Sequence, residues 1–161
     1  MRTRLIWLIT SILAIGLATT ASVAAADNTV TLTARLSGAQ EVPPADPDGS
    51  GKATVHIDVA GGQVCFDIKS LKDTGAPNRG HIHRGGPGVN GGIVVPFFEL
   101  RPGDALVTDP RHDALEAGRL QDCVPGDPAI LAEIVANPAG FYVNVHNARF
   151  PGGSLRCQLE P

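Results

Sequence analysis

The chain has few aromatic residues and no run of basic residues, and these shortages exclude several classes of protein. Only 4% of its 161 residues are aromatic, with one Trp and one Tyr, so the sequence offers no platform for stacking nucleobases. Thirteen Lys and Arg are outnumbered by 16 Asp and Glu, which argues against nucleic acid or an anionic membrane surface as a partner. Nucleophile-elbow, phosphate-cradling and calcium-loop patterns are also missing, so no motif indicates an enzyme.

Long apolar runs are missing except near the N-terminus. Arg2 and Arg4 precede an apolar run at residues 5–17, and small residues then lead to an A-x-A pattern. This order is typical of a secretory signal peptide, and the run is shorter than the roughly 20 apolar residues of a membrane span. We expect a signal peptide at residues 1–26 and a secreted or periplasmic domain at 27–161, with no transmembrane segment after cleavage.

Cysteine is scarce, but the three that remain after cleavage would meet an oxidising compartment. Two are expected to pair there, and Cys65, Cys123 and Cys157 allow three pairings. Cys157 lies in phase with Leu155 and Leu159 on the apolar side of its expected strand, whereas Cys123 falls in an expected loop. The favoured arrangement is a strand-to-loop bridge between Cys65 and Cys123, with Cys157 buried and free.

Glycine and proline are plentiful, with 19 and 13 residues, and they disfavour regular helix. Apolar and polar residues alternate in short runs, which is typical of half-buried strands. One helix is expected from Asp127, which can cap it, to Asn137. The pattern predicts a single all-β domain, an antiparallel sandwich or barrel with one short helix. The expected strands are 30–36, 53–59, 64–68, 80–83, 93–98, 140–146 and 154–159.

Three histidines occupy alternating positions on two of these strands. His81 and His83 project from one face about 7 Å apart, and His146 is in phase with Asn144 on another strand. If the strands adjoin, three imidazoles would suit copper or zinc. Alternatively, the histidines hydrogen-bond the backbone of the Gly-rich loop 84–92 and hold it in place. A joint metal site requires ring nitrogens within about 4 Å of one another, and separations beyond about 7 Å would exclude it.

Four motifs follow one another along the chain: Leu36–Pro44, Gly49–Ala53, Gly80–Gly91 and Tyr142–Leu159. In this order they resemble the motifs of the CHRD (chordin) domain family. The resemblance implies an immunoglobulin-like β-sandwich or barrel, placement outside the cytoplasm, and motif or loop-anchoring positions at Asn90, Asn144 and Arg156. Cys157 stands where the family usually has Gly.

Two functions are compatible with these observations. The first is a non-enzymatic binding or structural module of the cell envelope or extracellular space, which contacts a protein or surface ligand through its Gly-rich loops. The alternative is a copper- or zinc-binding protein that uses His81, His83 and His146, with weak redox activity as an extension. Neither a ligand nor a partner can be identified from the sequence.

Overall fold

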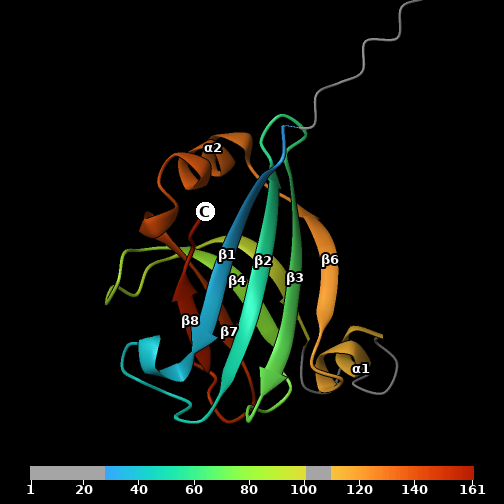
Figure 1. Cartoon of the computed structure of the whole chain (residues 1–161), viewed down its shortest axis with the longest axis vertical. Helices are drawn as coiled ribbons and strands as arrows, with labels where there is room; N and C mark the ends of the chain where they lie inside the picture. The colour runs from blue at the N-terminus through green and yellow to red at the C-terminus, as the bar shows by residue number, and fades with distance from the viewer. Residues whose placement is uncertain (1–27, 101–109) are drawn as a thin grey trace, which may run out of the picture.

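The computed structural model describes residues 28–100 and 110–161. The predicted signal peptide at residues 1–26 lies outside them. The described chain is mainly antiparallel β-structure, which confirms the all-β prediction, and its eight strands form a single, nearly closed sheet (Figure 1). The strands are β1 (Val30–Ser37), β2 (Ser50–Asp58), β3 (Gln63–Lys72), β4 (Arg79–Arg84), β5 (Ile93–Glu99), β6 (Leu120–Pro125), β7 (Phe141–His146) and β8 (Leu155–Gln158).

The strand order around the sheet is β5-β4-β7-β8-β1-β2-β3-β6. β1, β2 and β3 form a meander, in which Leu32 pairs with Val55 and Val55 pairs with Phe66. The β2–β3 turn includes Gly62 at φ +61°, a conformation that glycine adopts without steric cost. β4 lies between β5 and β7, so the strand with two histidines is the neighbour of the strand with the third.

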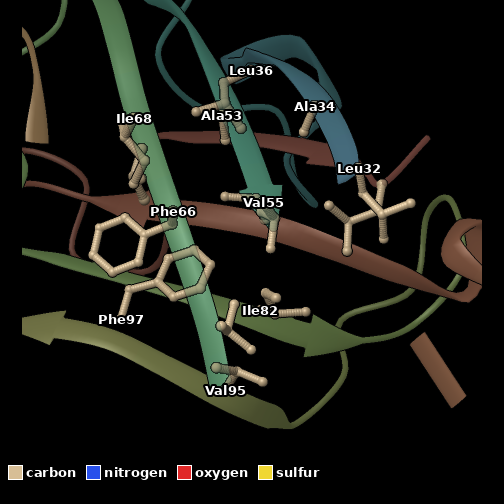
Figure 2. Packing of buried hydrophobic residues seen from close by; sticks show 14 of the residues in the cluster. Leu32, Ala34, Leu36, Ala53, Val55, Phe66, Ile68, Ile82, Val95 and Phe97 are labelled. Atoms are coloured by element: carbon tan, nitrogen blue, oxygen red, sulfur yellow. The ribbon is translucent and has the colours of Figure 1, made fainter. Parts of the chain in front are cut away.

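The interior of the curled sheet is the apolar core. Alternate residues of β1, β2 and β3 point inward and are buried, because a strand presents successive side chains to opposite faces. Figure 2 shows Phe66 of β3 meeting Phe97 of β5, and their stacked ring centroids lie 4.3 Å apart. Ile82 of β4 and Val95 of β5 join the same cluster. The core therefore connects β5, at one end of the strand order, with β3, near the other end, by side-chain packing across the interior.

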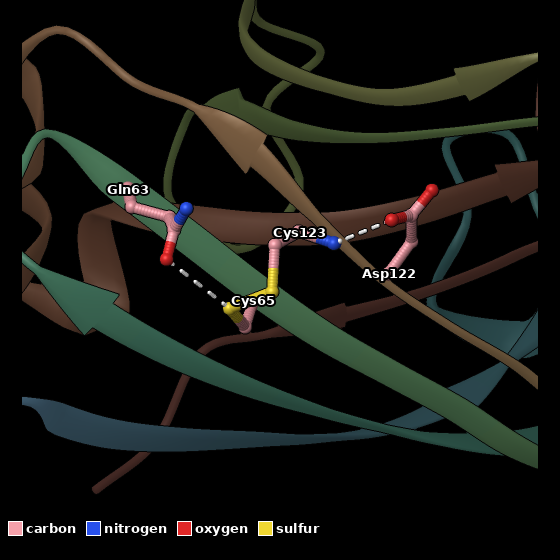
Figure 3. Close-up of a disulfide and its surroundings, with 4 residues drawn as sticks. All are labelled: Gln63, Cys65, Asp122 and Cys123. Atoms are coloured by element: carbon pink, nitrogen blue, oxygen red, sulfur yellow. Dashed lines mark hydrogen bonds between the residues drawn. A yellow bond between two sulfur atoms is a disulfide. The ribbon is translucent and has the colours of Figure 1, made fainter.

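A disulfide joins Cys65 to Cys123, as the sequence favoured, and Cys157 is a buried free thiol. The expectation that Cys123 lies in a loop is wrong, because Cys123 belongs to β6 and sits directly opposite Cys65 of β3 (Figure 3). β6 is the last strand of the sheet order, and Gln121 to Cys123 are all exposed. Such an edge strand shows no alternation that would reveal it in the sequence.

Two α-helices accompany the sheet, one more than expected. α2 (Pro128–Ala136) begins beside Asp127, whose carboxylate accepts a hydrogen bond from the Ala129 N–H, and lies over one end of the sheet (Figure 1). α1 (Pro110–Glu116) was not predicted, and it packs Leu115 into the core. Two 3-10 turns complete the described elements, η1 (Gly38–Gln40) and η2 (Pro138–Gly140).

Candidate metal centre

The pairing of β4 with β7 brings three histidines together on the outer face of the sheet. Antiparallel register places His81 opposite Asn144, and His146 opposite Arg79. The candidate ligand nitrogens of His81, His83 and His146 all lie within 4.8 Å of one another. This separation is wider than the 4 Å expected from the sequence, but it is well inside the 7 Å that would have excluded a joint site.

Hydrogen bonds to backbone carbonyls fix the protonation of two rings. His83 Nδ1 lies 2.9 Å from the Gly91 carbonyl oxygen, and His146 Nδ1 lies 3.0 Å from that of Pro151. A carbonyl only accepts hydrogen bonds, so each Nδ1 carries the proton and donates it. In a neutral imidazole the lone pair then resides on Nε2, the arrangement that metal-binding histidines commonly use.

Each of the three rings has one buried nitrogen without a hydrogen-bond partner. His81 Nδ1, His83 Nε2 and His146 Nε2 are buried and accept or donate no hydrogen bond among the described residues. Buried polar atoms in folded proteins are nearly always paired, and an unpaired one costs about 1–3 kcal/mol. Five side-chain atoms of the described residues are buried without a partner, and three of them belong to this cluster; the other two are Asn78 Oδ1 and Asn144 Oδ1.

The cluster is held in its neutral form. Burial, followed by the charges of the other two histidines and Arg79, lowers the pKa of His81 to about 4. Burial, together with Arg79, lowers the pKa of His146 to about 4, against the opposing hydrogen bond to Pro151. Burial also lowers the pKa of His83. Neutral imidazole is the form that binds a metal, so at neutral pH no proton has to leave.

A second polar group lies beside the histidines. Asn144 donates a side-chain hydrogen bond to the Glu41 carboxyl, which is buried after η1. Burial raises the pKa of Glu41 to about 7, although the charge of Arg156 and the Asn144 hydrogen bond lower it. Gly153 packs directly against this pair, because a Cβ there would come within 2.7 Å of the Glu41 oxygens. Glu41 therefore holds the side chain of Asn144, whose cross-strand neighbour on β4 is His81.

Arg156 fastens the Gly-rich loop over this face. It is only 1% exposed, and its guanidinium donates to the carbonyls of Gly86 and Val89 and to the side chain of Asn90. Asn90 in turn donates to the Val42 carbonyl at 2.7 Å. Asn90 and Arg156, two of the three positions expected from the family resemblance, thus connect three separate segments, whereas Asn144 bonds Glu41.

Tyr142 links Arg156 to the histidines. The guanidinium carbon of Arg156 lies 3.4 Å from the centre of the Tyr142 ring. The His83 ring stacks on the same tyrosine with centroids 4.9 Å apart. The Tyr142 hydroxyl accepts a hydrogen bond from the Gly91 N–H. β7 lies between β4 and β8, so the three stacked side chains come from three neighbouring strands.

The sequence analysis identified the three histidines, Asn90, Asn144 and Arg156, but it missed Glu41 and Arg79. Glu41 lies within the Leu36–Pro44 motif, and the available signal was a carboxyl within an apolar, Pro-containing stretch. Arg79 donates to the Pro151 carbonyl that also accepts from His146. No local pattern marks Arg79, because its contact spans 72 positions of the chain.

The fold and the site define an all-β domain with a buried polar face, closed by loops and stapled by a disulfide. No helix in the described ranges is long and apolar enough to cross a membrane. The CHRD domain profile matches residues 32–159, and the chain belongs to the CHRD domain family. No curated protein and no solved structure matches the chain.

Proposed function

We propose that this protein is an exported metal-binding module that holds one copper or zinc ion with His81, His83 and His146. The observation that carries the proposal is a set of three histidines whose candidate ligand atoms lie within 4.8 Å of one another and each of which has a buried ring nitrogen without a partner. A bound ion would satisfy all three. Tetrahedral ligands at 2.0–2.1 Å from a metal lie about 3.4 Å apart, so the most widely separated pair of nitrogens would approach each other by at most about 1.4 Å when the ion binds.

An exported location is compatible with a bound copper or zinc ion. The Cys65–Cys123 bridge fits an oxidising compartment, and the predicted signal peptide fits the same location. The rigid strands β4 and β7 supply all three ligands, which favours a fixed geometry over a loop-borne site. The carbonyls of Gly91 and Pro151 would act as the outer partners that orient His83 and His146.

The test is the metal content of the cleaved protein, produced by export and purified without a His tag. We expect about one copper or zinc ion per chain by plasma mass spectrometry. His81→Phe and His146→Phe keep a buried ring but remove its nitrogens, and both should lose the ion. His56→Phe is the matched control, because His56 lies on β2 and bonds only Thr31.

A protein that stays free of metal after dialysis against Cu(II), Cu(I) and Zn(II), with an unchanged thermal midpoint, would remove this proposal. The second candidate, a binding module for a protein or surface ligand, would then stand. One observation favours it: the exposed large apolar side chains of the described residues are Val89 and Ile93. Val89 lies in the Gly-rich loop and Ile93 directly follows it, so a pull-down comparing wild type with Val89→Ser and Ile93→Ser tests that surface.

A further inference from the structure

The donor set of the cluster is electrically neutral. Among the described residues, the group that could hold an ion contains His81, His83 and His146, with no carboxylate or thiolate. Glu41 directs its carboxyl to Asn144, and Cys157 packs in the apolar core on the opposite face of β8 from Arg156. An ion held by three imidazoles would therefore keep its full positive charge.

Two guanidinium groups add positive charge beside the cluster. Arg79 and His146 both donate a hydrogen bond to the Pro151 carbonyl, so the guanidinium lies close to the His146 ring. Arg156 stacks on Tyr142, which in turn stacks on His83. The repulsion between an ion and a fixed charge is proportional to the charge of the ion. A divalent ion is therefore repelled twice as strongly as a monovalent ion at the same place.

Burial of the site also favours a monovalent ion over a divalent one. The three unpaired nitrogens are inaccessible to solvent, and the cost of moving an ion out of water rises steeply with its charge. Zn(II) held by three protein ligands takes water or another ligand as its fourth, whereas the unpaired histidine nitrogens of this cluster are inaccessible to solvent. Cu(I) has a filled d shell and is stable with three nitrogen ligands, so it matches both the number of donors and the low charge.

We propose that the His81–His83–His146 cluster binds copper as Cu(I), in preference to Zn(II) and Cu(II). The inference rests on the proposed metal-binding function and specifies its ligand. Its basis is the neutral donor set, the two adjacent guanidinium groups and the burial of the nitrogens.

Competition titrations of the tag-free apoprotein test the preference. Cu(I) is titrated anaerobically against a chromophoric Cu(I) chelator, and Zn(II) against a fluorescent zinc chelator. We expect one Cu(I) per chain, bound at least about tenfold more tightly than Zn(II). The Cu(I)-loaded protein should also give no Cu(II) signal in electron paramagnetic resonance after exposure to air.

Arg79→Gln sharpens the test, because it removes the charge and keeps a hydrogen-bond donor for Pro151. If Cu(I) binding tightens about threefold, Zn(II) binding should tighten by the square of that factor, about tenfold. Arg79→Lys keeps the charge and should leave the ratio unchanged, as should Arg35→Gln, a change at an exposed residue of β1.

Each result bears on a different claim. Zn(II) bound as tightly as Cu(I) by the wild type would overturn the Cu(I) preference and leave the metal-binding function intact. A ratio that Arg79→Gln does not change would overturn the electrostatic basis of that preference. Failure to bind any of the three ions would overturn the proposed function itself. If Arg79→Gln does not fold, the wild-type competition still decides the preference.

Discussion

β2 and β7 belong to the same sheet, yet they differ on their outer faces. Along β2 the burial alternates, with Val55 and Ile57 buried and the residues between them partly exposed. Along β7 all six residues are buried, although polar Asn144 and His146 alternate with apolar Val143 and Val145. An outward polar residue is ordinarily solvated. Around β7 the loops cover the outward polar residues. The same alternation of polar and apolar residues therefore gives a solvent-exposed face on β2 and a buried polar face on β7.

This difference divides the molecule by role. The half of the sheet formed by β1, β2, β3 and β6 has an ordinary outer face and carries the disulfide. The part formed by β4, β7 and β8 has its polar face enclosed by the Gly-rich loop and the 147–153 loop, whereas Ile93, Pro96 and Glu99 of β5 are exposed. The first half can be altered at a cost in stability alone, whereas the second couples stability to the proposed metal site.

Removing the disulfide should have the largest effect on stability and little effect on metal binding. In Cys65→Ser/Cys123→Ser, the unfolded chain regains the freedom of a closed loop of 58 residues. We expect a loss of about 4 kcal/mol in the free energy of unfolding, measured by urea denaturation. Cys157→Ala is the control for removal of a cysteine without a bridge. A folded double variant that no longer binds metal would show that the two halves are not independent.

Replacing Arg156 should weaken both properties. Arg156→Met leaves the Gly86 and Val89 carbonyls and the Glu41 carboxyl without their cationic partner. We expect a loss of about 3 kcal/mol in the free energy of unfolding, the scale for breaking a buried charged network. Metal binding should fall with it, because the Gly91 carbonyl that orients His83 belongs to the same loop. Arg35→Met on the exposed face of β1 should change stability by less than about 0.5 kcal/mol.

An Arg156→Met protein with unchanged stability would mean that the Gly-rich loop holds its place without the guanidinium. The loop would then be anchored mainly by His83 and Gln158, which also bond its backbone. His83→Phe in the same background distinguishes these anchors, since it removes the bond to Gly91.

Acidification of the apoprotein should lower its stability through the histidines. The folded pKa values of His81 and His146 are about 4, below the ordinary value near 6.5 of an unfolded chain. Between these pH values the unfolded state binds more protons, so their contribution is full above pH 6.5 and is lost as the pH falls toward 4. We expect a loss of about 2 kcal/mol for each imidazole, measured from urea midpoints, and a smaller loss in His146→Phe.

Glu41 should oppose this trend. Its folded pKa of about 7 lies above the ordinary value of 4.5, so the folded state holds the proton more tightly over that range. Its contribution is greatest below pH 4.5 and is lost as the pH rises through 7. Glu41→Gln should therefore steepen the acid loss of the wild type. An acid profile that neither His146→Phe nor Glu41→Gln alters would contradict the assignment of these groups.

Features with local sequence signals were predicted, and features that depend on distant contacts were not. Most strands and α2 were predicted, because alternation and capping are local signals that the residues themselves carry. The convergence of His81, His83 and His146 required only that two predicted strands adjoin. Missed features depend on distant contacts: Glu41 reaches Asn144 across 103 positions. A short edge strand such as β6 and a seven-residue helix such as α1 carry too little periodicity to be recognised.

The smallest expected effect separates function from stability at a single residue. His81 forms no hydrogen bond through its buried Nδ1, and Phe fills nearly the same volume without a polar atom. His81→Phe should raise the free energy of unfolding of the apoprotein by about 1 kcal/mol, because an unpaired buried nitrogen is removed. The same change should abolish the rise in thermal midpoint that Cu(I) causes in the wild type.

His56→Phe on β2 is the matched control, and it should be neutral or slightly destabilising, because it removes the bond to Thr31. A destabilised His81→Phe apoprotein would show that the imidazole is retained for packing. A stabilised one that has lost its metal response would show the reverse: that the fold keeps an unfavourable buried nitrogen because an ion uses it. Since His56 on β2 and His81 on β4 belong to one sheet around one core, the opposite signs expected for these two substitutions measure how much stability the fold loses by burying an unpaired imidazole nitrogen.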